Sequence, residues 1–131
     1  MKNLSNQIDW GKCAGLIPAI IQDASNNEIL MLGFMNQEAL QKTLKTKQVH
    51  FYSRSRKKLW LKGETSGNFL NLISMQIDCD NDTLLVKANP SGNTCHKGTY
   101  SCFGSEKGKL AIIADLFTLI EKRKKEMPVK S

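Results

Sequence analysis

The sequence Leu16-Ile17-Pro18-Ala19-Ile20-Ile21-Gln22 is a short apolar run rich in isoleucine, which is typical of a β-strand. Pro18 within it favours an edge strand or a bulge, because proline has no N–H to donate to a neighbouring strand. Residues 23–27 have the composition of a turn, and residues 28–35 form a second strand-like run. The stretch therefore predicts a β-hairpin near the start of the chain.

A helix is predicted directly after this hairpin. Asn36 is a good N-cap, and Glu38 in the first turn complements the helix dipole. The residues that would face the core then recur at helical spacing over about three turns. They are Ala39, Leu40, Thr43 and Leu44.

The rest of the chain reads mainly as strands, which are expected at residues 49–53, 59–62, 69–77 and 83–88. Residues 90–104 are rich in Gly, Asn, Ser, Thr and Cys and predict a loop. Ser105 then caps an amphipathic helix from residue 109 to about residue 126. This order lacks regular β-α-β alternation. It predicts an α+β fold with a predominantly antiparallel, barrel-like sheet, an early short helix and a C-terminal helix.

Size and composition predict a single domain over residues 1–131. The hydrophobic fraction of 40% and the charged fraction of 24% are ordinary for a globular protein. We find neither an apolar run of the ~20 residues that span a bilayer nor a signal-peptide core, so we expect a cytoplasmic protein without a membrane partner. In a reducing compartment, the four cysteines are expected to bind metal or take part in chemistry rather than form disulfides.

The net charge of +7 is concentrated in two segments. Residues 121–131 carry five basic and two acidic side chains and predict a solvated basic tail. Residues 42–62 carry eight basic side chains and no acidic one. Such a segment attracts phosphate, either on a nucleic acid or on a small metabolite, and charge alone leaves both partners open.

Asp78, Asp80 and Asp82 form a pattern that favours a hard cation. On a strand their spacing puts the three carboxylates on one face, and in a tight loop it lets them converge. Carboxylates held this close repel one another unless a cation such as Mg²⁺ or Ca²⁺ neutralises them. An EF-hand is excluded, because Thr83 replaces the required glycine and Asn89 the bidentate glutamate. A polar turn between two strands is the simpler alternative.

Three cysteines accompany the aspartates. Cys79 lies between Asp78 and Asp80. Strand alternation would point its side chain away from the aspartates. Cys95 and Cys102 begin and end a segment of the loop predicted at residues 90–104. Three thiolates suit Zn²⁺ with a fourth position open for water, as in a catalytic site. A structural zinc would take His96 or Cys13 as its fourth ligand. Buried inert cysteines are the simpler alternative, and we expect Cys13 to be a free thiol.

Two further segments have the composition of an anion site. Residues 53–58 contain Arg54 and Arg56, whose guanidinium groups bind phosphate in a bidentate manner. Residues 63–68 supply hydroxyl groups and glycine amides that complete such a cradle. A solvated basic turn is the simpler alternative. A nucleic-acid groove also stays open, because aromatic side chains lie among or beside the charges, namely Phe51, Tyr52 and Trp60.

Together these segments resemble the phosphoribosyl-AMP cyclohydrolase family, whose members open the adenine ring in histidine biosynthesis. The resemblance covers residues 16–104 and is most specific in four ordered stretches. They are residues 51–56 (FYSRSR), 59–68 (LWLKGETSGN), 78–82 (DCDND) and 95–103 (CHKGTYSCF), with a weaker match at residues 32–40.

The resemblance implies a homodimer with one Zn²⁺ per subunit at the interface. Cys79 of one chain, and Cys95 and Cys102 of the other, would hold the zinc, and the three aspartates would hold Mg²⁺. The loop departs from the family at Asn93-Thr94, usually Pro-Ala, and at Lys97, often Thr, but no proposed ligand is lost. Only 27 residues follow Gly104, so we expect this chain to lack the pyrophosphohydrolase domain that many relatives carry.

The implied reaction hydrolyses the N1–C6 bond of the adenine ring of 1-(5-phosphoribosyl)-AMP to the ring-opened imidazole carboxamide, with a zinc-activated water and with Mg²⁺ assisting substrate binding. His96 would move the proton, because the unperturbed pKa of histidine is about 6.5. Glu64 would contact a ribose or assist the proton transfer. The residues expected to bind the substrate are Arg54, Arg56, Lys62, Thr65 and Ser66.

Two other functions compete with this one. A small zinc-stabilised module would bind RNA or DNA through residues 42–62, whereas the cyclohydrolase would bind a nucleotide and no nucleic acid. A zinc deaminase ranks last, because its H-x-E and P-C-x-x-C signature is absent from the sequence.

Overall fold

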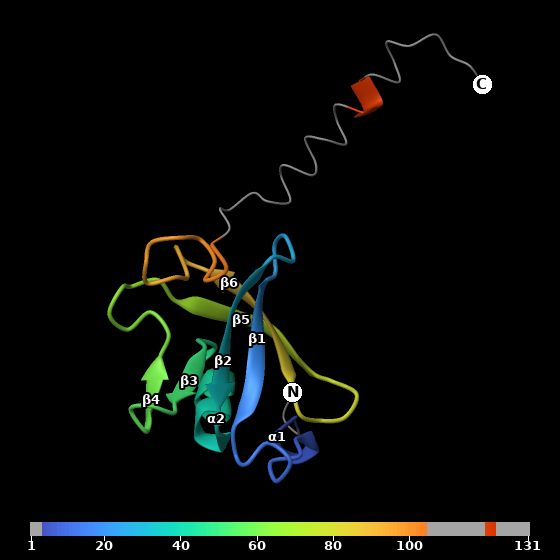
Figure 1. The fold of residues 1–131 in the computed structure, drawn as a ribbon, viewed down its shortest axis with the longest axis vertical. Coiled ribbons are helices and arrows are strands. Elements are labelled where there is room, and N and C mark those ends of the chain that lie inside the picture. The colour runs from blue at the N-terminus through green and yellow to red at the C-terminus, as the bar shows by residue number, and fades with distance from the viewer. Residues whose placement is uncertain (1–3, 105–119, 123–131) are drawn as a thin grey trace, which may run out of the picture.

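A computed structural model describes residues 4–104 and 120–122 of the chain. Almost all of the predicted C-terminal helix and of the basic tail lies outside the described residues; residues 120–122 are helical. Within residues 4–104 the elements are two helices and six strands (Figure 1). In chain order they are α1 (Leu4–Gln7), β1 (Ile17–Asp23), β2 (Ile29–Met35), α2 (Gln37–Thr46), β3 (His50–Ser53), β4 (Lys58–Leu61), β5 (Leu70–Ile77) and β6 (Leu84–Pro90).

The predicted hairpin is confirmed, since β1 pairs antiparallel with β2 around the turn at residues 24–28. Its strand β1 is nevertheless an inner strand, between β2 and β6, and not the edge that Pro18 favoured. β6 pairs with β1 only from Ala19 onward, so Pro18 lacks a partner strand on that side and its missing N–H breaks no bond there. The bulge that proline also favoured lies farther along, between Ile21 and Gln22.

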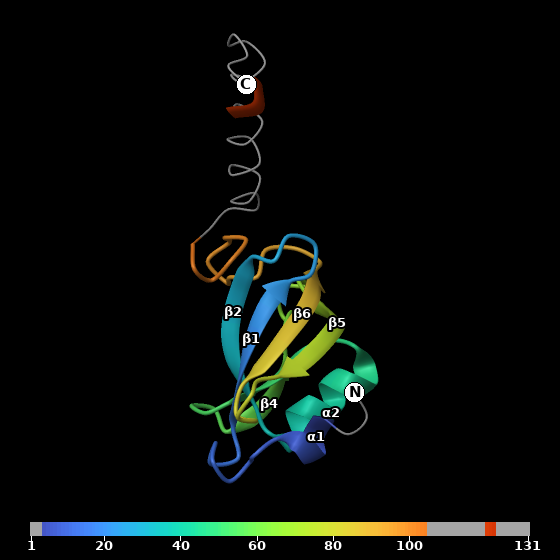
Figure 2. The same ribbon diagram turned by 90° about the vertical axis from the view of Figure 1, so that its right-hand side faces the viewer.

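The main sheet has the strand order β2-β1-β6-β5, and Figure 2 shows the four strands side by side in that order. β1–β2 and β5–β6 are antiparallel, but β1 and β6 run parallel. The α+β class is therefore confirmed. Two of the three pairings in this sheet are antiparallel, as expected, but the expected barrel-like form is corrected to an open sheet with one parallel pairing, in which β2 and β5 form the two edges over residues 4–104.

The helix α2 follows its predicted signals closely. Asn36 is the N-cap, and its side-chain oxygen accepts a hydrogen bond from the Ala39 N–H at 2.8 Å. The helix ends at Lys47, which has left-handed backbone angles and donates its N–H to the Thr43 carbonyl. Ala39, Leu40 and Thr43 form its buried face, which packs beside β3.

The ribbon of β3 and β4 is separate from the main sheet but packed against it. A single bridge, Gln48 with Asn71, joins its entry to β5. On the other side, the ring of Phe51 lies against the backbone of Gly33 in β2, where an added Cβ would come within 2.5 Å of the ring. This close approach packs β3 tightly against β2 and closes one side of the hydrophobic core.

In the described part of the chain, no helix is both long and apolar enough to cross a membrane.

Candidate functional site

A cavity of about 670 Å³ opens between two loops that are far apart in the sequence. One is the connection from β4 to β5, residues 62–69, and the other is the loop after β6, residues 91–104. The cavity is large enough for a nucleotide-sized ligand. The predicted site residues that line it are Arg56, Lys62, Glu64, Thr65, Ser66, Cys95 and His96.

Three contacts hold the two loops together. The Lys62 ammonium donates a hydrogen bond to the Thr94 carbonyl oxygen at 2.5 Å, one residue before Cys95. Ser91 Oγ accepts from the Phe69 N–H at 2.7 Å. Gly92 leaves room for the Asn68 side chain, whose oxygen would lie 2.3 Å from a Cβ at that position. The wall of the cavity therefore depends on contacts between both loops.

The loop after β6 folds back on itself, so that its two cysteines lie close together. Cys95 donates its N–H to the Thr99 carbonyl at 3.1 Å, and Thr94 donates to the Tyr100 carbonyl at 3.0 Å. Cys102 donates its N–H to the Leu30 carbonyl of β2 at 2.8 Å. Each thiol changes the pKa of the other, as neighbouring groups do.

The pKa values of the two thiols are shifted in opposite directions. Hydrogen bonds from the Lys97 backbone and the Thr99 side chain lower the pKa of the Cys95 thiol, and the Cys102 thiol adds to this effect. Partial desolvation raises the pKa of Cys102, and so does the negative charge of Cys95 beside it. Cys95 therefore ionises first, and a cation between the two sulfurs would favour ionisation of both.

Arg54 does not line this cavity. Its guanidinium carbon lies 4.1 Å from the centre of the Phe34 ring, on a second hollow of about 610 Å³ beside β2 and β3. This is a cation–π contact, which fixes the side chain on the far side of the β3–β4 turn. Of the two predicted arginines, the structure therefore brings only Arg56 to the cavity.

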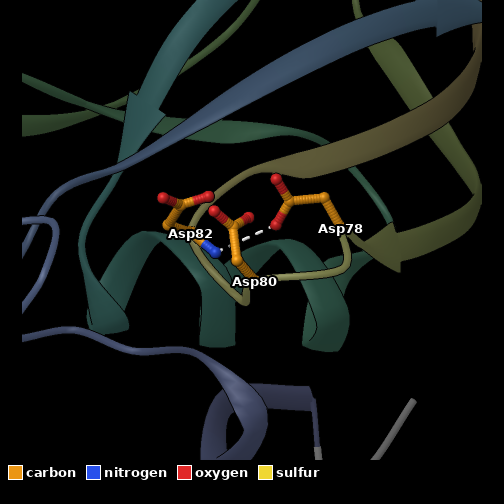
Figure 3. A group of neighbouring side chains, drawn as sticks. All are labelled: Asp78, Asp80 and Asp82. Atoms are coloured by element: carbon orange, nitrogen blue, oxygen red, sulfur yellow. Dashed lines mark hydrogen bonds between the residues drawn. The ribbon is translucent and has the colours of Figure 1, made fainter.

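The three aspartates meet in the turn between β5 and β6 (Figure 3). Each offers an oxygen within 4.8 Å of the others. Asp78 organises the turn, because its Oδ1 accepts hydrogen bonds from the backbone N–H groups of Asp82 at 3.0 Å and Thr83 at 3.1 Å. Asn81 adopts a left-handed conformation with φ of 65°, which reverses the chain. The three carboxylates therefore converge as predicted, and they do so in a tight turn and not along a strand.

Lys12 lies against this aspartate turn, although its sequence context gives no sign of it. Its ammonium is 3.0 Å from a carboxylate oxygen of Asp80 and 3.1 Å from one of Asp82. The ion pairs raise the pKa of Lys12 above its ordinary value, and Lys12 holds the pKa of Asp80 at about 2. Cys13 lies nearby, with its thiol 3.7 Å from the Asp82 carbonyl oxygen.

The predicted zinc ligands lie at opposite ends of β6. Cys79 is exposed in the turn before this strand, while Cys95 and Cys102 belong to the loop after it. The seven residues of β6 rise by about 20 Å, and Figures 1 and 2 both show the turn and the loop at opposite ends of the sheet. One chain therefore brings two of the three cysteines together, and Cys79 stands apart from them.

The donor sets fit the two predicted metals. The aspartate turn offers only carboxylate oxygens, which suit Mg²⁺, and it already attracts one cation, the Lys12 ammonium. Cys95 and Cys102 offer two adjacent sulfurs, one of them with a lowered pKa, which suits Zn²⁺. Two thiols leave zinc short of its usual ligands, so zinc bound here would require donors from elsewhere.

Sequence reasoning missed the groups that support the cysteine loop. In the sequence, Asp23 belongs only to a segment with turn composition, and Tyr100 only to the loop motif of residues 95–103. The structure joins them, because the Tyr100 hydroxyl donates a short hydrogen bond to a carboxylate oxygen of Asp23. Burial raises the pKa of Tyr100 to about 12, and the Asp23 carboxylate adds to the shift. No local signal predicts a pair 77 residues apart.

Comparison with known proteins identifies the family. Residues 31–104, more than half of the chain, match the family described as phosphoribosyl-AMP cyclohydrolase. The chain is 54% identical to the histidine biosynthesis bifunctional protein HisIE of Escherichia coli (strain K12), over 95% of this chain and 62% of that protein. It is 50% identical to the protein of the same name in Vibrio cholerae, over 98% of this chain and 62% of the relative.

The chain thus spans about three-fifths of the length of these curated relatives. The matched region contains the residues from both walls of the cavity, the aspartate turn and both cysteines of the loop after β6. The chain belongs to the phosphoribosyl-AMP cyclohydrolase family.

Proposed function

We propose that this chain hydrolyses the N1–C6 bond of the adenine ring of 1-(5-phosphoribosyl)-AMP, giving the ring-opened imidazole carboxamide in histidine biosynthesis. One observation carries the proposal: a single cavity is lined by the Cys95-His96 segment on one side and by a cradle of hydroxyl and basic groups on the other. The family membership and the similarity to histidine biosynthesis proteins support the same reaction.

The cradle fits a phosphorylated ligand. Arg56 supplies a guanidinium group for bidentate phosphate contacts, and Thr65 and Ser66 supply hydroxyl donors. Lys62 holds the Thr94 carbonyl, so it supports the wall and adds positive charge beside the thiols. Arg54 is exposed on the far side of the turn, and we assign it to a substrate phosphate that extends beyond the cavity.

His96 is the proposed proton carrier. It is exposed at the cavity and directly follows Cys95, so a proton moved by its imidazole would be close to the thiol pair. Imidazole is suited to this role, because histidine is the side chain that most often serves as a general acid or base in enzymes. Glu64 on the opposite wall would bind a ribose hydroxyl or assist the proton transfer.

Zinc would be held by Cys95 and Cys102 of one chain and Cys79 of the partner subunit in a homodimer, with one ion per subunit. The separation of about 20 Å along β6 supports this division, because a single chain brings only two of the three thiols together. When bound, zinc supplies an activated water for attack at neutral pH. We also assign the enzyme to the cytoplasm, where a reducing environment keeps such thiols available as ligands.

Magnesium would be held by Asp78, Asp80 and Asp82. In the proposed dimer, Cys79 stands in the same turn as these aspartates, so this turn of one subunit would lie at the cavity of the other. A divalent cation there would offset the charge of the substrate phosphates and assist substrate binding.

The decisive test is an absorbance assay of phosphoribosyl-AMP ring opening by the full chain, with and without added Zn²⁺ and Mg²⁺. We expect turnover that depends on zinc, and we expect Cys102→Ser to abolish it while the circular dichroism spectrum stays that of a folded protein. Near-normal turnover with far less than one zinc per chain would contradict the proposed mechanism. Unfolding on zinc removal without a separate loss of catalysis would favour a structural zinc instead.

A further inference from the structure

We propose that Asp23 and Tyr100 are positioning residues that hold the Cys95–Cys102 loop on the β1–β2 hairpin, so that its two thiols already lie together before a metal binds. The role of this pair rests on the proposed function, because the pair would position two of the proposed zinc ligands. The contacts themselves do not depend on the metal.

The pair is buried and joins two distant segments. Asp23 is 1% exposed at the end of β1, and Tyr100 is 5% exposed in the loop after β6. The Tyr100 hydroxyl donates to Asp23 Oδ2, and the Asn26 side-chain amide donates to the Tyr100 oxygen at 3.1 Å. A buried carboxylate is costly to place unless it is hydrogen-bonded, so this contact is strongly favoured once the segments meet.

The other oxygen of Asp23 shapes the hairpin turn. Oδ1 accepts hydrogen bonds from the Ser25 N–H at 2.8 Å and from the Ser25 hydroxyl at 2.7 Å. One carboxylate therefore fixes the turn with one oxygen and the cysteine loop with the other. The position of Tyr100 is defined relative to the rigid β1–β2 ladder.

Tyr100 controls both cysteines because it lies between them in the folded loop. On one side, its carbonyl accepts the Thr94 N–H at 3.0 Å, next to Cys95. On the other side, Ser101 is fully buried, its hydroxyl donates to the Ile29 carbonyl at 2.8 Å, and Cys102 donates its N–H to Leu30 at 2.8 Å. Tyr100 and Ser101 thus attach the loop to the β1–β2 hairpin between the two cysteines.

The contacts of Tyr100 and Ser101 matter because residues 62–69 hold only the first part of the loop, through Ser91, Gly92 and Thr94. Its residues are mostly small and polar, and Phe103 is 67% exposed. A zinc ion needs both sulfurs within reach at once, and a fixed backbone keeps them there. Preorganised ligands bind a metal more tightly, and loss of an outer partner typically lowers metal affinity by about 10- to 100-fold.

The test compares the full chain with Tyr100→Phe and Asp23→Asn. Zinc affinity is measured by competition with a chromophoric chelator, and the coordination is followed by the thiolate-to-cobalt absorption of the Co²⁺-loaded protein. We expect both variants to bind zinc on the order of 10- to 100-fold more weakly and to show a changed cobalt spectrum. Thr43→Val is the matched control, because it removes a buried hydroxyl that bonds to Ala39 and His50, away from the loop.

Hydrogen exchange of the metal-free protein tests the positioning role of the pair without zinc. In Tyr100→Phe, the amides of Thr94, Cys95 and Cys102 should lose protection selectively, while those of β1 and α2 keep it. Unchanged protection of these amides would overturn the proposal, as would an equal loss of zinc affinity in Thr43→Val at matched stability. If the wild-type protein bound no zinc, the proposed zinc mechanism would fail, and the exchange result would still decide the role of the pair.

Discussion

At the scale of single residues, Lys12 occupies the aspartate turn at which we propose that Mg²⁺ binds. Its ammonium pairs with both Asp80 and Asp82, at 3.0 and 3.1 Å, and must be displaced before a divalent cation can use these oxygens. We predict that Lys12→Met raises the affinity for Mg²⁺ by a few-fold, because the competing cation is removed. Isothermal titration with Mg²⁺ measures this.

The control for Lys12 is Lys45→Met, which makes the same change of charge on the exposed side of α2. It should leave the Mg²⁺ affinity nearly unchanged. If both variants gained affinity equally, general charge would be responsible rather than the ion pairs of Lys12.

The two thiols of the cysteine loop should also react at different rates in the metal-free protein. The pKa of Cys95 is lowered and that of Cys102 is raised, so at pH 8 a larger fraction of Cys95 is the reactive thiolate. We predict that iodoacetamide modifies Cys95 first and that the difference narrows as the pH rises. Peptide mass spectrometry after timed quenching distinguishes the two sites.

A second variant tests the coupling between the thiols. In Cys95→Ser, the negative charge beside Cys102 is removed, so the pKa of Cys102 should fall and its alkylation should become faster. Slower or unchanged alkylation of Cys102 would show that the two thiols do not interact as the structure indicates.

At the scale of elements, the contact between β2 and β3 depends on one missing side chain. A Cβ at Gly33 would lie 2.5 Å from the Phe51 ring, and both strands are fixed by their own partners. We predict that Gly33→Ala lowers the free energy of unfolding by about 1–3 kcal/mol through overpacking. Urea denaturation measures the change.

Two comparisons check that this effect is steric. Gly11→Ala adds the same methyl group where the nearest atom is 3.7 Å away, and it should change stability by less than about 0.5 kcal/mol. The double variant Gly33→Ala with Phe51→Leu should lose less stability than the sum of the two single losses, because the smaller side chain relieves the clash. A double variant as unstable as the sum of both changes would rule out this explanation.

The elements that sequence predicts well are those with local causes. The hairpin turn and the Asn36 cap of α2 are each specified within a few residues, and the structure has both. The parallel pairing of β1 with β6 joins residues 65 positions apart, such as Ala19 and Leu84, and no local pattern encodes it. The same reason explains why the expected barrel was wrong, since closure depends on how distant strands meet.

At the scale of the whole molecule, some features of the site follow from continuous segments of sequence, and others depend on tertiary contacts. Sequence motifs identified both walls of the cavity, because each wall is one continuous segment. They did not reveal that Arg54 turns away toward Phe34, or that Asp23 supports the cysteine loop, because both depend on tertiary contacts. Spacing along the chain also gave no measure of the distance between Cys79 and the other two cysteines, which the length of β6 determines.

That distance leads to a prediction about pairs of chains. If zinc is shared across a two-fold interface, a chain with Cys79→Ser and a chain with Cys102→Ser are each inactive alone. In a mixed dimer, one site carries both changes and the other carries neither. Purification through one tag on each chain isolates the mixed dimers, half of whose sites are intact, so their activity should recover to roughly half of the wild-type value.

The matched control pairs Cys95→Ser with Cys102→Ser. Both cysteines belong to the same loop, so every site of the mixed dimer lacks one of them and no activity should return. The ring-opening assay on co-expressed chains, purified through two different tags, measures both pairs. Failure of the first pair to recover would mean that Cys79 does not complete the site across an interface. Recovery in the control would mean that Cys95 and Cys102 do not serve the same metal.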